Sequence, residues 1–120
     1  MSGRPAGAPE PLAAPDVLTA ADLLPAETPL GERATLVQLS TTFCAPCRSA
    51  RTVLARAAAT SHGVVHVDVD VTGHEALAER LALTETPTIL VLDAAGHVVE
   101  RRTGVPRLAQ VRAVLETLGA

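Results

Sequence analysis

Two cysteines, Cys44 and Cys47, are the residues whose type and spacing point most directly to chemistry. They are the only cysteines in the chain, and Ala45 and Pro46 between them complete a Cys-x-x-Cys motif. A disulfide between residues this close in sequence closes too short a loop to stabilise a fold appreciably. The pair is therefore interpreted as a redox pair that interconverts a dithiol and a disulfide.

The place of the motif in the chain predicts how the two thiols differ. It lies between a segment with the pattern of a strand and a segment with the pattern of a helix, so Cys44 is expected at a helix N-terminus. Unpaired N–H groups and the helix dipole favour a thiolate there, and thiols in such pairs have pKa values of about 3.5 to 7.5 instead of about 8.5. Pro46 suits the first helical turn. Cys44 is predicted to attack a partner disulfide, and the more buried Cys47 to resolve the mixed disulfide.

Two other interpretations of the cysteines are weaker. The first is that both cysteines are inert buried residues, but this does not explain their position between a strand and a helix, which the redox motif requires. A zinc site needs two histidines to complete four ligands, and only His62 and His66 have suitable spacing, across a predicted loop and strand. No metal and no cofactor are therefore expected. The histidines at 62, 66, 74 and 97 are all interpreted as surface residues.

The rest of the chain predicts helices that alternate with strands. Val65, Val67 and Val69 alternate with polar residues, as in a strand with one buried face, whereas 89–92 is wholly apolar, as in a central strand. The expected elements are a helix over 19–24, a strand over 34–40, a helix through 50–58 that ends at Gly63, a strand over 64–70, a helix over 74–83, strands over 89–92 and 98–102, and a helix over 108–118. A short strand at Val17 and Leu18 is a further option in front of them.

Connection rules turn this order of elements into an architecture. A strand, a helix and a second strand in succession form a right-handed crossover, so 34–40 and 64–70 are expected to be parallel. The last two strands, joined by a short turn, are expected to form an antiparallel hairpin. The predicted fold class is α/β, with a mixed central sheet that is covered by helices on both faces.

The composition is typical of a single globular domain. The chain has 120 residues, of which 48% are hydrophobic and 19% are charged. Residues 1–15 are rich in Pro, Ala and Gly without an apolar period, and they are expected to form a flexible tail. The folded domain is therefore placed at 16–120 and is expected to be a monomer.

Charge and hydropathy argue against several classes of partner. The net charge is −3, and the basic residues are ten dispersed arginines. Phe43 is the only aromatic residue, so the chain has no stacking platform for bases, and no nucleic acid partner is expected. No run approaches the roughly 18 apolar residues that cross a bilayer, so no membrane segment is expected. Because the N-terminus lacks the pattern of an export signal, a cytoplasmic location is expected.

The run from Phe43 to Arg48, reading Phe-Cys-Ala-Pro-Cys-Arg, followed by Thr86-Pro87-Thr88 at the start of a strand, resembles the thioredoxin family. The resemblance extends from about Thr35 to the end of the chain. It implies a thioredoxin-like fold, protein disulfides as substrates and a reductase that recycles the cysteine pair.

The resemblance also implies which residues contact a substrate. The proline that corresponds to Pro87 is cis in the family and lies opposite the cysteines, where the backbone before it pairs with an extended substrate. Thr86 and Pro87 are accordingly expected to bind substrate, and Gly104 is expected near the same groove. The other expected substrate contacts flank the cysteines and are Phe43, Ala45 and Pro46.

Three residues depart from the family pattern. Phe43 occupies the place of a usual Trp, Ala45 the place of a Gly, and Gln38 the place of a buried acid that helps to move the proton of the resolving thiol. A glutamine cannot accept that proton. His66 lies where a lysine is common in the family, so Gln38 and His66 are the candidate neighbours for proton transfer. Water, or no group at all, is the alternative.

The predicted function is thus dithiol-disulfide exchange with protein disulfides, as a reductant. One alternative is an oxidant or isomerase of the same fold, because the dipeptide between the cysteines does not fix the reduction potential. A second alternative is a thioredoxin-like binding module in which the thiols have no catalytic part.

Overall fold

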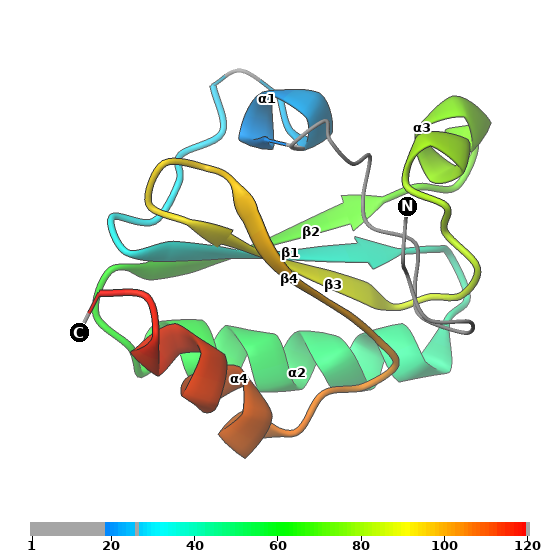
Figure 1. Ribbon diagram of the computed structural model, residues 1–120. Coiled ribbons are helices and arrows are strands. Elements are labelled where there is room, and N and C mark those ends of the chain that lie inside the picture. Colours follow the sequence, from blue (N-terminus) through cyan, green and yellow to red (C-terminus); the bar gives the residue numbers. More distant parts are fainter. Residues whose placement is uncertain (1–18, 26, 120) are drawn as a thin grey trace, which may run out of the picture.

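A four-stranded sheet forms the centre of the protein in a computed structural model that describes residues 19–25 and 27–119 (Figure 1). Its strands are β1 (Ala34–Ser40), β2 (Val64–Asp70), β3 (Thr88–Asp93) and β4 (Val98–Thr103). They are arranged in the order β2-β1-β3-β4, with β1 and β2 parallel and the other neighbours antiparallel. The expected parallel pair and the expected hairpin are both confirmed.

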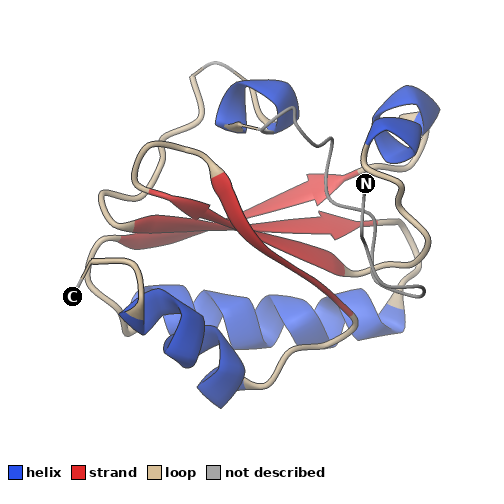
Figure 2. Cartoon of the chain, in the orientation of Figure 1, coloured by secondary structure: helices blue, strands red, loops and turns tan. Residues whose placement is uncertain are grey.

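Helices cover both faces of this sheet, as Figure 2 shows. The long α2 (Ala45–Ala59) and α4 (Leu108–Glu116) lie on one face, and the short α1 (Ala20–Leu23) and α3 (Glu75–Arg80) lie on the other. The predicted α/β class with a mixed sheet is therefore confirmed. The proposed tail at 1–15 and the optional strand at 17–18 lie outside the described residues. Within the described residues, no helix has the length and apolar character needed to cross a membrane.

The side chains of β1 alternate between two apolar cores, and every residue of the strand is buried. Leu36 packs with residues of α2 and α4, and Val37 and Leu39 pack on the opposite face with Leu81 at the end of α3. The period of two places Gln38 and Ser40 on the same side as Leu36, toward α2. The strand therefore carries two polar side chains into the layer beneath the N-terminus of α2.

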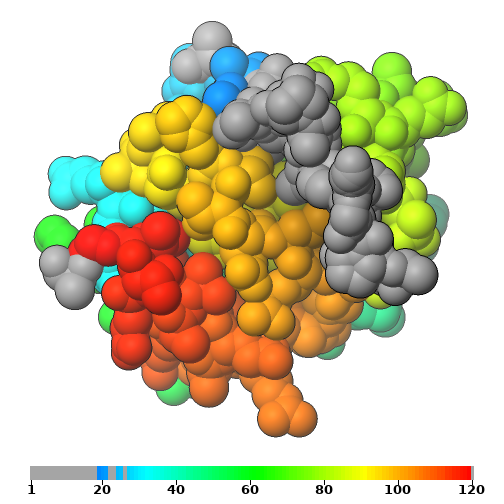
Figure 3. Space-filling view, viewed as in Figure 1, coloured from blue at the N-terminus to red at the C-terminus, as the bar shows by residue number. Residues whose placement is uncertain are grey.

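β4 is an edge strand of the sheet. It lies on the face of the molecule that Figure 3 shows, with α4 at the lower left. It carries the charged run 100–102. Charged residues on an edge strand limit its pairing with the sheet of another molecule.

The helices α2, α3 and α4 end earlier than the sequence predicts. α2 ends at Ala59 and α4 at Glu116. α3 spans only 75–80, because Ala82 turns the chain with a φ of 50° and Arg101 binds the carbonyl groups of Leu81 and Ala82 at 2.7 and 3.0 Å. In α3 and α4 the apolar period continues past the last helical residue, so it does not reveal where the helical hydrogen bonds stop, whereas α2 is capped by Thr60 before it reaches Gly63.

Arg33, directly before β1, joins the start of the sheet to the end of α4. Its Nη2 donates to the carbonyl of Leu115 at 2.7 Å, and its Nε donates to the carbonyl of Leu118 at 3.3 Å. The last carbonyl groups of a helix lack partners within the helix, and a cation there also complements the helix dipole. α4 has no basic residue in its own last turn, so this distant arginine supplies its C-terminal cap.

Replacing Arg33 with Met is expected to lower the free energy of unfolding by about 1–2 kcal/mol, because Met keeps an apolar stem but loses both donors. Urea unfolding measures the change. Arg112→Met is the matched control, since the Arg112 guanidinium binds only an exposed hydroxyl, that of Thr60, among the contacts of the described residues. The control is expected to change stability by no more than about 0.5 kcal/mol. Equal losses in the two variants contradict the role of Arg33 as a cap.

Candidate active site around Cys44 and Cys47

The cysteine pair lies in the turn between β1 and α2 and at the start of that helix. Phe43 adopts a left-handed backbone conformation with a φ of 61°, and its side chain is 97% exposed. Cys44 is the N-cap of α2, and its Sγ accepts a hydrogen bond from the N–H of Cys47 at 3.1 Å. The two sulfur atoms form a disulfide. The turn thus exposes Phe43 and directs the Cys44 sulfur at the unpaired N–H groups of the first helical turn.

The two cysteines differ in their access to solvent. Cys47 is 1% exposed and contributes to the first turn of α2, whereas Cys44 is half-buried. Ala45 and Pro46, between them, are exposed, and the proline lies in the first turn, where its missing N–H removes no helical hydrogen bond. Cys44 thus lies at the positive end of the α2 dipole, where N–H groups without helical partners favour negative charge. Of the two sulfur-bearing residues, Cys44 is therefore the more accessible one.

Thr86 and Pro87, far from the cysteines in sequence, lie beside Cys44. The peptide bond between them is cis. The Sγ of Cys44 is 3.6 Å from Thr86 Oγ1 and 3.8 Å from the Thr86 carbonyl oxygen. Thr41 also contacts this segment, with its hydroxyl 3.2 Å from that of Thr86. The segment that leads into β3 therefore forms one side of the surface around the Cys44 sulfur.

Gly104, directly after β4, holds the backbone of this segment. Its N–H donates to the carbonyl of Pro87 at 2.9 Å, and its φ of 82° favours glycine. Val105, next in the chain, is an exposed apolar residue. Gly104 is thus connected to the cysteines through the Pro87 backbone, at the same end of the sheet.

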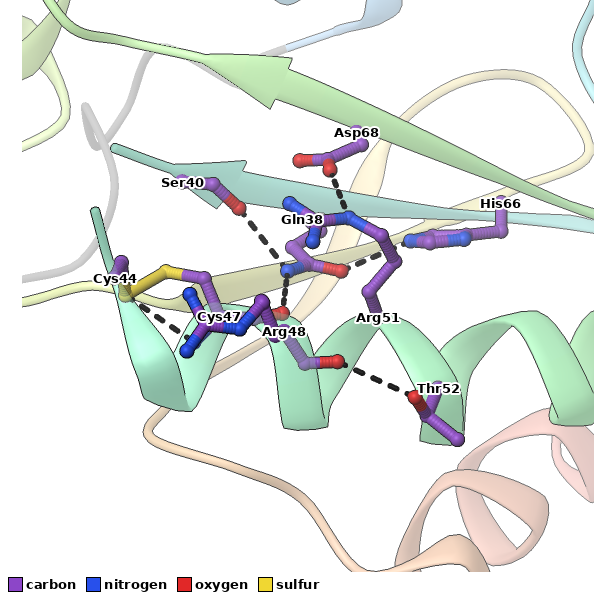
Figure 4. Close-up of polar contacts among 9 residues, drawn as sticks. All are labelled: Gln38, Ser40, Cys44, Cys47, Arg48, Arg51, Thr52, His66 and Asp68. Atoms are coloured by element: carbon purple, nitrogen blue, oxygen red, sulfur yellow. Dashed lines mark hydrogen bonds and ion pairs between the residues drawn. A yellow bond between two sulfur atoms is a disulfide. The ribbon is translucent and has the colours of Figure 1, made fainter. Parts of the chain in front are cut away.

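Gln38 is fully buried beneath the first turns of α2 and makes three polar contacts (Figure 4). Its Nε2 donates to the carbonyl of Cys47 at 2.8 Å and to the hydroxyl of Ser40 at 3.0 Å, and its Oε1 lies 3.0 Å from His66 Nε2. Because a carbonyl can only accept, the Cys47 contact fixes which end of the amide carries the hydrogens. His66 must therefore donate from Nε2 to Gln38.

His66 is half-buried on β2 and is not the surface residue that its sequence pattern predicted. Burial lowers its pKa, and the positive charge of Arg51 acts in the same direction, while Asp68 opposes them. The imidazole is consequently neutral at neutral pH, with its proton on the nitrogen that faces Gln38. The remaining three histidines, at 62, 74 and 97, are more exposed than His66 and make no contact with the cysteine motif among the described residues.

Two site residues were missed in the sequence analysis, Ser40 and Thr41. Ser40 binds the Gln38 amide, and Thr41 binds Thr86. The signal that marks them is the change from apolar to hydroxyl side chains at the end of a buried strand. Among the described residues, no group of three or more His, Cys, Asp or Glu side chains is placed to hold a metal ion.

Solved thioredoxin structures are similar to this fold. A mutant thioredoxin from Halobacterium salinarum NRC-1 has a TM-score of 0.64 at 19% identity, over 74% of this chain and 77% of that chain. Thioredoxin f from spinach chloroplast has a TM-score of 0.60 at 20% identity, over 72% and 77% of the two chains. Chloroplastic thioredoxin z has a TM-score of 0.62 at 25% identity, over 72% and 78%.

No curated protein matches this chain. The model of the thioredoxin family, by contrast, matches residues 27–117, which include both cysteines, Pro87 and all four strands. The chain therefore belongs to the thioredoxin family.

Proposed function

We propose that this protein transfers electrons from its Cys44–Cys47 dithiol to disulfides of other proteins. One observation carries the proposal: an accessible cysteine caps α2, its partner cysteine is buried one turn behind it, and Thr86 lies beside the accessible sulfur. This arrangement separates a sulfur that can attack from a sulfur that can only resolve.

The exchange takes place in two steps. The Cys44 thiolate attacks one sulfur of the partner disulfide, which forms a mixed disulfide and breaks the partner S–S bond; the departing partner thiolate takes up a proton. The Cys47 thiolate then attacks the Cys44 sulfur, forms the intramolecular disulfide and releases the second partner sulfur. Two electrons pass to the partner, and the two thiol protons of this protein end on the two partner thiols.

Substrate binding is proposed at the surface around Cys44. By analogy with the family, an extended substrate segment pairs with the backbone at Thr86, next to Pro87. Phe43, almost fully exposed, offers apolar contact on the other side of the sulfur. Gly104 leaves room for the substrate because it has no side chain, and the exposed Ala45 and Pro46 complete the contacts.

The direction of electron flow is proposed to be that of a reductant, in a cytoplasmic monomer that a reductase recycles. The reduction potential of the pair, measured against a glutathione or dithiothreitol buffer, tests this direction. A value near about −270 mV supports a reductant, and a value near about −120 mV supports an oxidant.

Cys47→Ser is expected to trap partner proteins as mixed disulfides, because the attacking sulfur remains and its resolving thiol is lost. Non-reducing electrophoresis after mixing with a disulfide-containing protein measures the trapped species. Cys44→Ser is the matched control and is expected to trap nothing and to abolish disulfide reduction. If both variants still reduce a peptide disulfide at the parent rate, the thiols are not catalytic and the binding-module alternative gains support.

The proton of Cys47 needs a route that avoids the Gln38 amide. Gln38 lies between His66 and the Cys47 backbone, and its amide neither gains nor loses a proton near neutral pH. We therefore propose that His66 orients Gln38 and that the departing partner thiolate, directly or through water, takes the proton of Cys47. Gln38 and His66 are thus positioning residues in this scheme.

Gln38→Glu keeps the size of the side chain but replaces the amide by a titratable carboxyl. Loss of the donors to Cys47 and Ser40 is expected to lower the free energy of unfolding by about 1–3 kcal/mol. Burial raises the pKa of such a carboxyl toward neutrality, so the reduction rate is expected to gain a new pH-dependent increase. Gln38→Met, which loses the donors without gaining a titratable group, is expected to lose stability only. Identical pH–rate profiles for the two variants contradict this account.

His66→Gln is expected to flatten the dependence of stability on pH below neutrality. Burial lowers the pKa of His66, so the unfolded chain binds a proton more readily than the folded protein. The parent therefore has its full stability above the ordinary value of 6.5 and loses part of it as the pH falls from there through the lowered pKa. Urea unfolding from about pH 8 to 5 measures the difference, with His62→Gln as control. Parallel curves for parent and His66→Gln show that His66 is not responsible.

A further inference from the structure

A polar pocket of about 310 Å³ lies beside Cys44 on the β2 side of the motif. Its wall includes Ser40, Cys44 and charged side chains from α2 and β2. Thr86 and Pro87 are not part of this wall, because β3 lies on the opposite side of β1 from β2. The Cys44 sulfur thus has the Thr86 segment on one side and a charged pocket on the other.

Two arginines of α2 line this pocket next to the cysteine. Cys44, Arg48 and Arg51 are spaced at i, i+4 and i+7, which places them along one face of the helix. In Figure 4, Arg51 extends from α2 toward Asp68 on β2, and its Nε donates to Asp68 Oδ2 at 2.6 Å. Arg48 is exposed, and within the described part of the chain its guanidinium has no partner. As far as the described residues show, the group that follows Cys44 along this face is therefore a cation without a partner.

The two aspartates of the pocket are already engaged. Asp68 is paired with Arg51. Asp70, at the end of β2, accepts hydrogen bonds from the Thr72 N–H at 2.9 Å and the Thr42 hydroxyl at 3.4 Å. These contacts hold the pKa of Asp70 below its ordinary value, so the carboxyl stays ionised and bound to the loop. The carboxylates thus balance the arginines overall, but they leave Arg48 available beside the reacting sulfur.

We propose that this pocket receives an acidic side chain of the substrate, next to the cysteine that Cys44 attacks, and that Arg48 binds its carboxylate. The inference rests on the proposed reduction of protein disulfides and adds a preference among them. A guanidinium binds a carboxylate through paired N–H donors. The Nη groups of Arg51, which make no hydrogen bond to any described residue, can contribute in the same pocket. Arg48 is a specificity residue in this scheme, because the exchange reaction itself does not require it.

The test compares three peptide disulfides that differ only in a Glu, Gln or Lys next to the reacting cysteine. We expect kcat/KM for the Glu peptide to exceed that for the Gln peptide by about two- to fivefold, the range for an exposed ion pair, and the Lys peptide to react most slowly. Arg48→Gln is expected to remove the difference. The ratio between peptides is the readout because any effect of Arg48 on the Cys44 thiolate changes all three rates alike.

Arg56→Gln is the matched control, since it removes the same charge from the exposed surface of α2 outside the pocket. It is expected to leave the ratio unchanged. Equal rates for the three peptides, preference for Lys, or equal effects of the two variants overturn the proposal. If Arg48→Gln slows only the reduction of oxidised glutathione, the pocket serves small acidic disulfides and the peptide proposal is again overturned. Failure to reduce any of these disulfides contradicts the proposed function instead.

Discussion

The hydrogen bond from Gln38 to the carbonyl of Cys47 joins the central strand β1 to the first turn of α2, which carries the cysteine pair. The position of β1 is fixed, because the strand is buried on both faces and hydrogen-bonded to a neighbouring strand on both edges. Because Gln38 donates a hydrogen bond to the backbone of α2, it fixes the first turn of that helix, with both cysteines, against β1. Its other end is held by His66 on β2, so the turn is tied to two parallel strands at once. Burying a polar amide costs little here because all three of its contacts are made.

Strand order determines what surrounds the reactive sulfur. β1 leads into the turn that carries Cys44, β3 starts at the neighbouring Thr86–Pro87 segment, and β2 ends at Asp70 on the other side. One antiparallel neighbour and one parallel neighbour thus bring different groups to the same end of the sheet: the backbone and hydroxyl of Thr86 from the side of β3, and charged side chains from the side of β2. A mixed sheet allows this arrangement, because the start of the antiparallel β3 and the end of the parallel β2 lie on opposite sides of the cysteine motif.

The elements with a regular pattern could be predicted from the sequence, and so could the pairing of Cys44 with Cys47. Alternating valines marked β2, an apolar run marked β3, and the Cys-x-x-Cys motif between a strand and a helix marked the turn. The helix ends could not be predicted, and neither could the hydrogen bonds among the polar residues of the site, although the family resemblance had already singled out Gln38 and His66. They depend on contacts between residues far apart in the chain, such as Arg33 with Leu115 and Gln38 with His66. The alternating pattern of a strand does not tell whether a histidine in it is buried or exposed. Only the fold shows that His66 contacts Gln38.

Arg33 and Arg101 each bind two carbonyl groups at the end of a helix, and the chain contains no lysine that could do the same. A guanidinium spans two acceptors with a rigid fork, whereas an ammonium is a compact charge on a flexible stem. Acetylation, methylation and other reactions at lysine amines therefore have no target at either helix end. The anchoring of α3 and α4 is in this respect insensitive to the amine chemistry that alters the surface charge of most proteins.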